Sequence, residues 1–97
     1  MKIVCIGDIL LPPEMMKEGI KGFSRYNRQK FFYFGPTTKE DMRIYIKNME
    51  LTGSRCVPVP QEIMEEIKDA DVIQTHQCPI PSELFREAKN LKLLLTN

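Results

Sequence analysis

Short apolar runs alternate with amphipathic segments from one end of the chain to the other. The runs at residues 3–6, 30–34, 71–74 and 91–95 are rich in β-branched, aromatic or leucine side chains, and they predict four β-strands. The first run, Ile-Val-Cys-Ile, is apolar at every position instead of at alternate ones. That pattern is typical of a strand that is buried on both faces of a sheet.

The segments between these runs carry helical patterns. Prolines at positions 13, 60 and 81 each suit the first turn of a helix, and the first of these helices is predicted over residues 13–23. The strongest helix prediction covers residues 38–53, because Thr38 and Asp41 match a helix-capping pattern. The apolar residues of that helix fall on one face, and they are Met42, Tyr45, Ile46 and Met49.

Four strands separated by helices predict an α/β fold with a parallel sheet and right-handed crossovers. We expect one domain over residues 1–97 with the flavodoxin-like strand order 2-1-3-4 and helices on both faces. In such sheets ligands bind beyond the carboxyl ends of the strands, near the point where the strand order reverses. The segments predicted to lie at those ends are 7–11, 35–38, 75–80 and Asn97.

The composition narrows the functional classes. Fourteen Lys and Arg against thirteen Asp and Glu leave a net charge of +1, which favours neither nucleic acid nor a membrane surface as a partner. The apolar run near the amino terminus is too short for a membrane span or a signal peptide. The three cysteines have no C-x-x-C spacing, so the sequence predicts no zinc site and no disulfide framework. A cytoplasmic location is the expectation.

The loop that follows the third predicted strand contains the polar residues most typical of a binding site. The candidate contacts in it are Thr75, His76, Gln77, Cys78 and Pro79. The alternative is that these groups only satisfy the backbone of a strand-to-helix turn. A catalytic role for His76 would require a carboxylate that orients the ring, and the acidic residues nearest in sequence are Asp71 and Glu83. We therefore assign no catalytic residue.

Two further groups at these strand ends have alternative interpretations. Cys78 is either a nucleophile activated by the helix that follows or a small loop residue. Asp8 either binds a ligand hydroxyl or a metal, or forms an Asx-turn after the first strand. The sequence contains neither G-x-G-x-x-G nor G-x-x-x-x-G-K-[ST], and prolines replace glycines in the first turn. The chain by itself is therefore not expected to bind a dinucleotide.

Residues 67–97 resemble the amino-terminal domain of the D-isomer-specific 2-hydroxyacid dehydrogenases. The family has a strand of the type D-A-D-x-I, a polar substrate loop, a helix, and then N-L-K-L-I. This chain has IKDADVI at 67–73, the polar loop at 75–79, and PIPSELFREAKNLKLLLTN at 79–97. Upstream, only the order of elements agrees, and the loop lacks the Ser-Lys or Arg-Ser pair of many relatives.

The resemblance implies an NAD(H)-dependent oxidoreductase that reduces 2-keto acids to D-2-hydroxy acids and has two α/β domains around a cleft. It implies that this chain is the substrate-binding domain, inactive alone, and that the cofactor motif and the catalytic Arg, Glu and His belong to a second domain of a homodimeric enzyme. Substrate contacts would come from the loop at 75–79 and from Asn97. The alternative is a stand-alone small-ligand-binding or subunit-interaction domain of the same fold.

Overall fold

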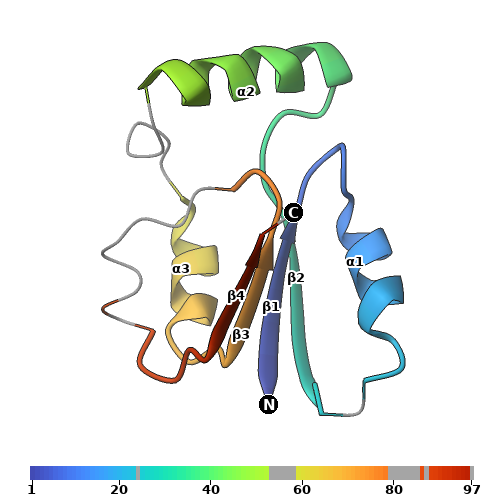
Figure 1. Ribbon diagram of the computed structural model, residues 1–97, viewed down its shortest axis with the longest axis vertical. Coiled ribbons are helices and arrows are strands. Elements are labelled where there is room, and N and C mark those ends of the chain that lie inside the picture. Colours follow the sequence, from blue (N-terminus) through green and yellow to red (C-terminus); the bar gives the residue numbers. More distant parts are fainter. Residues whose placement is uncertain (24, 53–58, 79–85, 87, 97) are drawn as a thin grey trace.

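The chain folds around a four-stranded sheet in which every neighbouring pair of strands is parallel (Figure 1). The computed structural model describes residues 1–23, 25–52, 59–78, 86 and 88–96. The strands are β1 (Lys2–Gly7), β2 (Arg28–Tyr33), β3 (Val72–Thr75) and β4 (Leu93–Thr96), and their order is β2-β1-β3-β4. The predicted fold class and strand order are confirmed.

Strand β1 lies in the interior of the sheet and is buried on both faces. Ile3 and Cys5 face one apolar cluster, whereas Val4 and Ile6 face the other. All four side chains are at most 1% exposed. Because successive side chains of a strand point to opposite faces, a strand covered on both sides needs apolar residues at every position. Burial on both faces therefore explains why residues 3–6 are apolar without interruption.

Two helices cover the two faces of the sheet, on opposite sides in Figure 1. Helix α1 (Pro13–Ile20) packs through Met16 and Ile20. Helix α3 (Gln61–Ile67) packs through Ile63 and Ile67. Helix α1 ends earlier than the predicted residue 23, next to two glycines at positions 19 and 22 that favour a helix poorly.

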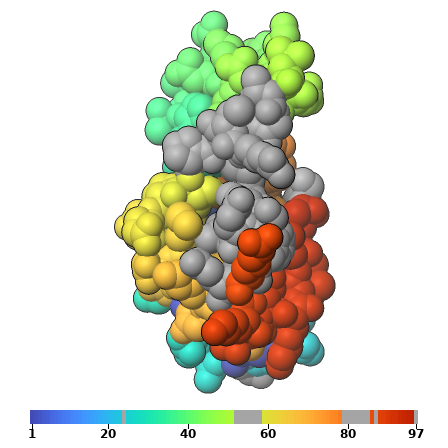
Figure 2. All heavy atoms as spheres, turned by 90° about the vertical axis from the view of Figure 1, so that its left-hand side faces the viewer, coloured from blue at the N-terminus to red at the C-terminus, as the bar shows by residue number. Residues whose placement is uncertain are grey.

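Helix α2 (Lys39–Thr52) covers neither face of the sheet. It lies across the carboxyl ends of the strands, at the top of Figure 1 and as the green layer at the top of Figure 2. Its start confirms the predicted cap, because the Asp41 N–H donates to Thr38 Oγ1 at 3.1 Å. Met42 is fully buried, whereas Ile44 is 55% exposed. The sheet edge where ligands bind in this fold class therefore has a helix beside it.

The remaining boundaries differ from the prediction by one or two residues. Strand β2 begins at Arg28 instead of residue 30, and it ends before Gly35, whose φ of +115° is a conformation that favours glycine. Most of the helix expected from Pro81 lies outside the described residues. None of the helices in the described part of the chain is long and apolar enough to cross a membrane.

The turn after β1 requires glycine at position 7. A Cβ atom on Gly7 would lie 2.5 Å from the Leu11 carbonyl oxygen and 2.8 Å from the Pro13 nitrogen, and both are backbone atoms that move only with the turn. We expect Gly7→Ala to lower the free energy of unfolding by about 1–3 kcal/mol, as overpacking of a rigid site does.

Gly19→Ala is the matched control for this measurement by urea denaturation. A Cβ atom there meets nothing within 4 Å, and alanine favours a helix by up to about 1 kcal/mol relative to glycine. The control is therefore expected to be stabilised. Equal effects of the two substitutions would contradict the steric explanation.

Candidate functional site

The candidate site lies where the order of the strands reverses. The chain passes from β1 to β2 on one side and returns to β3 on the other side of β1. Ile6 is paired in register with Thr75, so the residues that follow the two strands emerge side by side. Asp8 follows β1 and His76 follows β3. This edge is the position at which parallel α/β sheets bind their ligands.

The side chain of Asp8 is held at both carboxylate oxygens. Its Oδ1 accepts hydrogen bonds from the N–H groups of Leu10 and Leu11, each at 2.9 Å. Its Oδ2 lies 2.9 Å from Nδ1 of His76. The residue is 1% exposed, so protein groups replace water around the charge. The Asx-turn expected from the sequence is confirmed, and a partner 68 residues away is added to it.

His76 therefore has the orienting carboxylate that sequence analysis did not find. Sequence analysis considered the acidic residues nearest along the chain, Asp71 and Glu83, whereas the parallel pairing of β1 and β3 brings in Asp8. The His76 side chain is 18% exposed, more than its partner. A buried carboxylate on one ring nitrogen and partial exposure of the ring are the arrangement that acid–base and hydrogen-bonding histidines use.

The other residues predicted to contact substrate divide into three groups. Thr75 and Cys78 point inward, since they are 2% and 5% exposed and the Thr75 hydroxyl donates to the Cys78 carbonyl at 3.0 Å. Gln77 is partly exposed beside His76. Pro79 and Asn97 lie outside the described residues. Within the described loop, Thr75 and Cys78 shape the turn, and His76 and Gln77 remain accessible.

The interpretation of Cys78 as a nucleophile is disfavoured by its surroundings. Burial, and then the negative charge of Asp8, raise the pKa of the Cys78 thiol to about 12. The thiolate is the reactive form, so at neutral pH this side chain is an inert thiol. Burial in β1 likewise raises the pKa of Cys5 to about 11, and this thiol belongs to the core.

Tyr45 of helix α2 belongs to the site, although sequence analysis assigned it only to the apolar face of that helix. Its hydroxyl donates to the Gln77 carbonyl oxygen at 3.1 Å, and its ring meets Phe34 edge-on. Burial, followed by the charges of Cys78 and Asp8, raises its pKa to about 12. The tyrosine thus joins α2 to the loop that carries His76. Periodicity could not indicate this role, because an apolar stripe does not say which surface it covers.

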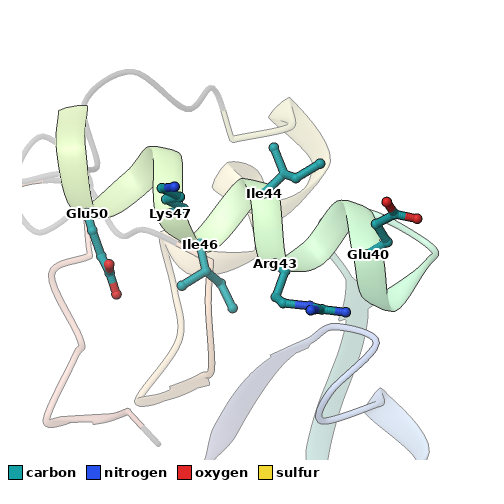
Figure 3. A pocket seen from close by; sticks show the side chains of 6 residues that line it. All are labelled: Glu40, Arg43, Ile44, Ile46, Lys47 and Glu50. Carbon is teal, nitrogen blue, oxygen red and sulfur yellow. The ribbon is translucent and has the colours of Figure 1, made fainter.

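Sequence analysis also did not assign Arg43 of α2 to the site. An open hollow of about 670 Å³ runs along this helix, lined by Glu40, Arg43, Ile44, Ile46, Lys47 and Glu50. In Figure 3, Arg43 points from the helix toward the strand ends, whereas Lys47 does not. Within the described ranges no acidic side chain forms an ion pair with Arg43. An unpaired guanidinium beside this edge is a suitable partner for a carboxylate.

Nothing in the described residues forms a metal site, since no three His, Cys, Asp or Glu side chains gather in one place. The amides of the first turn are also engaged, because Leu10 and Leu11 donate to Asp8 and the Asp8 N–H donates to the Leu11 carbonyl at 3.0 Å. These amides cannot cradle a phosphate without breaking the turn.

Comparison of the chain with protein-family models, curated proteins and solved structures finds no match. The resemblance to the 2-hydroxyacid dehydrogenases therefore rests on the motifs of residues 67–97. The site itself is defined by the contact between Asp8 and His76 and by the hydrogen bond from Tyr45 to the Gln77 carbonyl.

Proposed function

We propose that this chain is the substrate-binding domain of an NAD(H)-dependent enzyme that interconverts 2-keto acids and D-2-hydroxy acids. The observation that carries the proposal is the Asp8–His76 pair at the reversal of strand order. It is a polar, oriented group at the edge where this fold class takes small ligands. The ordered motifs of residues 67–97 give the chemical class of that ligand.

The described side chains match the two polar parts of such an acid. The imidazole of His76 hydrogen-bonds the oxygen on C2, and Asp8 keeps the ring in place. The guanidinium of Arg43 pairs with the carboxylate, for which its planar fork of donors is well suited. Two contacts, one at the C2 oxygen and one at the neighbouring carboxylate, fix the orientation of the acid, which is the contribution a substrate domain makes to catalysis.

The proposal assigns the nicotinamide cofactor to a second domain outside these 97 residues. The sequence holds no G-x-G-x-x-G motif, and the amides of its first turn are occupied. When bound beside the substrate, NAD(H) supplies or accepts the hydride. The residues of this chain bind and orient the acid.

The test is a titration of the isotopically labelled chain with D-lactate and pyruvate, followed by amide NMR shifts. We expect saturable shifts in residues 8–11 and 75–78, and none with NADH alone. Arg43→Gln is expected to weaken binding about tenfold, the effect of losing roughly 1.5 kcal/mol from a charge-assisted hydrogen bond. Lys47→Gln is the matched control, because Lys47 lies on the same helix but does not point to the strand ends.

Two results would contradict this function. One is the absence of any saturable shift with either acid. The other is a set of shifts that map to the opposite, amino-terminal edge of the sheet, where Lys2 and Arg28 lie.

One observation favours the subunit-interaction alternative. A second, smaller hollow lies between α1 and the sheet, and several exposed apolar side chains border it, among them Met15, Phe23 and Leu95. Met15 is 60% exposed and Phe23 is 52% exposed. Apolar side chains grouped in this way are typical of surfaces that contact other proteins. Sedimentation of the chain over a range of concentrations decides whether this face drives self-association.

A further inference from the structure

The two ring nitrogens of His76 have different surroundings. Nδ1 lies 2.9 Å from Asp8 Oδ2, whereas within the described part of the chain no group is hydrogen-bonded to Nε2. The side chain is 18% exposed, and Nε2 is the ring nitrogen that Asp8 leaves for a ligand. An ionised carboxylate only accepts hydrogen bonds, which places the shared proton on Nδ1. In the neutral imidazole Nε2 is then an acceptor.

The orientation of Asp8 is fixed by the backbone. Its Oδ1 accepts two N–H groups, those of Leu10 and Leu11, and this leaves only Oδ2 for the ring. Rotation of the carboxylate would break both backbone bonds in a place that water does not reach, since the residue is 1% exposed. The carboxylate is therefore a fixed acceptor, and His76 cannot exchange the roles of its nitrogens without losing it.

We infer that Asp8 is a positioning residue that holds His76 in the Nδ1–H tautomer, so that the site takes the 2-hydroxy acid in preference to the 2-keto acid. The inference rests on the proposed function and adds to it a preference for one of the two acids. A C2 hydroxyl has a proton to donate to Nε2, whereas a C2 ketone oxygen only accepts. With a ketone, Nε2 and the C2 oxygen are both acceptors, so no hydrogen bond forms between them.

The expected preference is modest but measurable. One hydrogen bond between neutral groups contributes about 0.5–1.5 kcal/mol, which corresponds to roughly a threefold to tenfold difference in Kd. We expect D-lactate to bind more tightly than pyruvate by this factor. The two acids share their carboxylate and their carbon skeleton, so the difference reports on the C2 oxygen.

Asp8→Asn reverses the tautomer by a defined route. The asparagine oxygen is required by the N–H groups of Leu10 and Leu11, which turns its NH₂ group toward Nδ1 of His76. Because that NH₂ group donates, Nδ1 becomes the acceptor and Nε2 carries the proton. The ring then presents a donor, which the hydroxyl oxygen and the ketone oxygen can both accept, and the preference for D-lactate is expected to disappear.

The experiment combines two readouts on the whole chain. Nitrogen-15 shifts of labelled histidine distinguish the two tautomers directly, and His76 is the only histidine. Titration with D-lactate and pyruvate then gives the two Kd values for the native chain and for Asp8→Asn. Asp41→Asn is the control, because it makes the same chemical change at an exposed position of α2 and leaves the partner of the ring unchanged. It is expected to leave the tautomer and the order of the two affinities unchanged.

The outcomes separate the inference from the proposed function. An Nδ1–H tautomer with tighter binding of D-lactate, and the loss of this preference in Asp8→Asn, supports both the inference and the proposed function. A native Nε2–H tautomer overturns the inference even if Asp8→Asn fails to fold, since this readout needs no variant. Equal affinities for the two acids with the Nδ1–H tautomer overturn the preference and leave the function intact. The Nδ1–H tautomer with no binding of either acid overturns the proposed function, whereas the role of Asp8 toward His76 stands.

Discussion

Ile73→Ala is expected to lower the free energy of unfolding by about 2–5 kcal/mol, the range of such truncations in protein cores. Ile73 is fully buried in β3 and belongs to the cluster between the sheet and α3. Its neighbours there include Ile6, Ile63 and Ile67. The substitution removes apolar contacts and leaves a cavity that a close-packed interior fills only in part.

The matched control is Ile44→Ala, the same chemical change at a surface position. Ile44 is 55% exposed on α2, and alanine favours a helix more than isoleucine does. We expect its effect to stay within about 0.5 kcal/mol. Urea denaturation with a shared m-value measures both variants. A loss at Ile73 no larger than at Ile44 would show that the sheet is not packed against α3 as described.

Lys2→Met is expected to cost about 1.5–3 kcal/mol at neutral pH, the contribution of hydrogen bonds to charged groups. Lys2 is 3% exposed, and its Nζ donates to Glu66 Oε2 at 2.7 Å and to Asp69 Oδ1. Arg28 also donates to Asp69, at 2.7 Å. Without the ammonium group the two carboxylates repel each other at the end of α3, and only Arg28 remains to balance them.

The ion pairs of Lys2 with Glu66 and Asp69 make the stability of the fold depend on pH. Burial lowers the pKa of Lys2, but the hydrogen bonds and charges of Asp69 and Glu66 outweigh it and raise the pKa above the usual 10.5. Its contribution is therefore complete below pH 10.5 and is lost as the pH rises through the folded-state pKa. Hydrogen bonds from Lys2 and then Arg28 lower the pKa of Asp69 below the usual 3.8. That contribution is complete above pH 3.8 and is lost as the pH falls through the lowered pKa.

We therefore expect these two groups to contribute a decline of stability on the acid side and on the alkaline side of neutral pH. In Lys2→Met the part of the alkaline decline that comes from Lys2 should be lost, and the part that comes from the buried Cys5, Cys78 and Tyr45 should remain. The acid decline should become shallower, because Arg28 still binds Asp69. Unfolding free energies measured across pH for both proteins test this. An unchanged alkaline limb in the variant would assign that limb to another group.

The sheet and its order were predictable because they depend on patterns that the chain carries locally. A run of four apolar residues at 3–6 needs cover on both faces, and helical segments between strands favour parallel pairing. The cap at Thr38 was predictable for the same reason, since both of its partners lie within one turn. The end of α1 was less predictable, because a helix end depends on packing as well as on propensity.

The candidate site was predictable only in part. The position of the loop with His76 follows from the strand order, and its polar sequence marks it. Its chemistry does not follow, because the partner of His76 is 68 residues away and because Thr75 and Cys78 turn inward. Tyr45 and Arg43 were missed because their helix was expected to cover a face of the sheet, whereas it lies beyond the strand ends.

The sequence by itself determined the class of fold and the interior position of β1, and it predicted the edge of the sheet where the candidate site lies. Hydrophobic periodicity and short crossovers leave few alternatives at that level. Only the tertiary structure decided which side chains meet at that edge. The carboxylate of Asp8 and the ring of His76 come together because β1 and β3 are neighbours in register. Such a contact depends on strand pairing across the sheet, and no spacing along the chain encodes it.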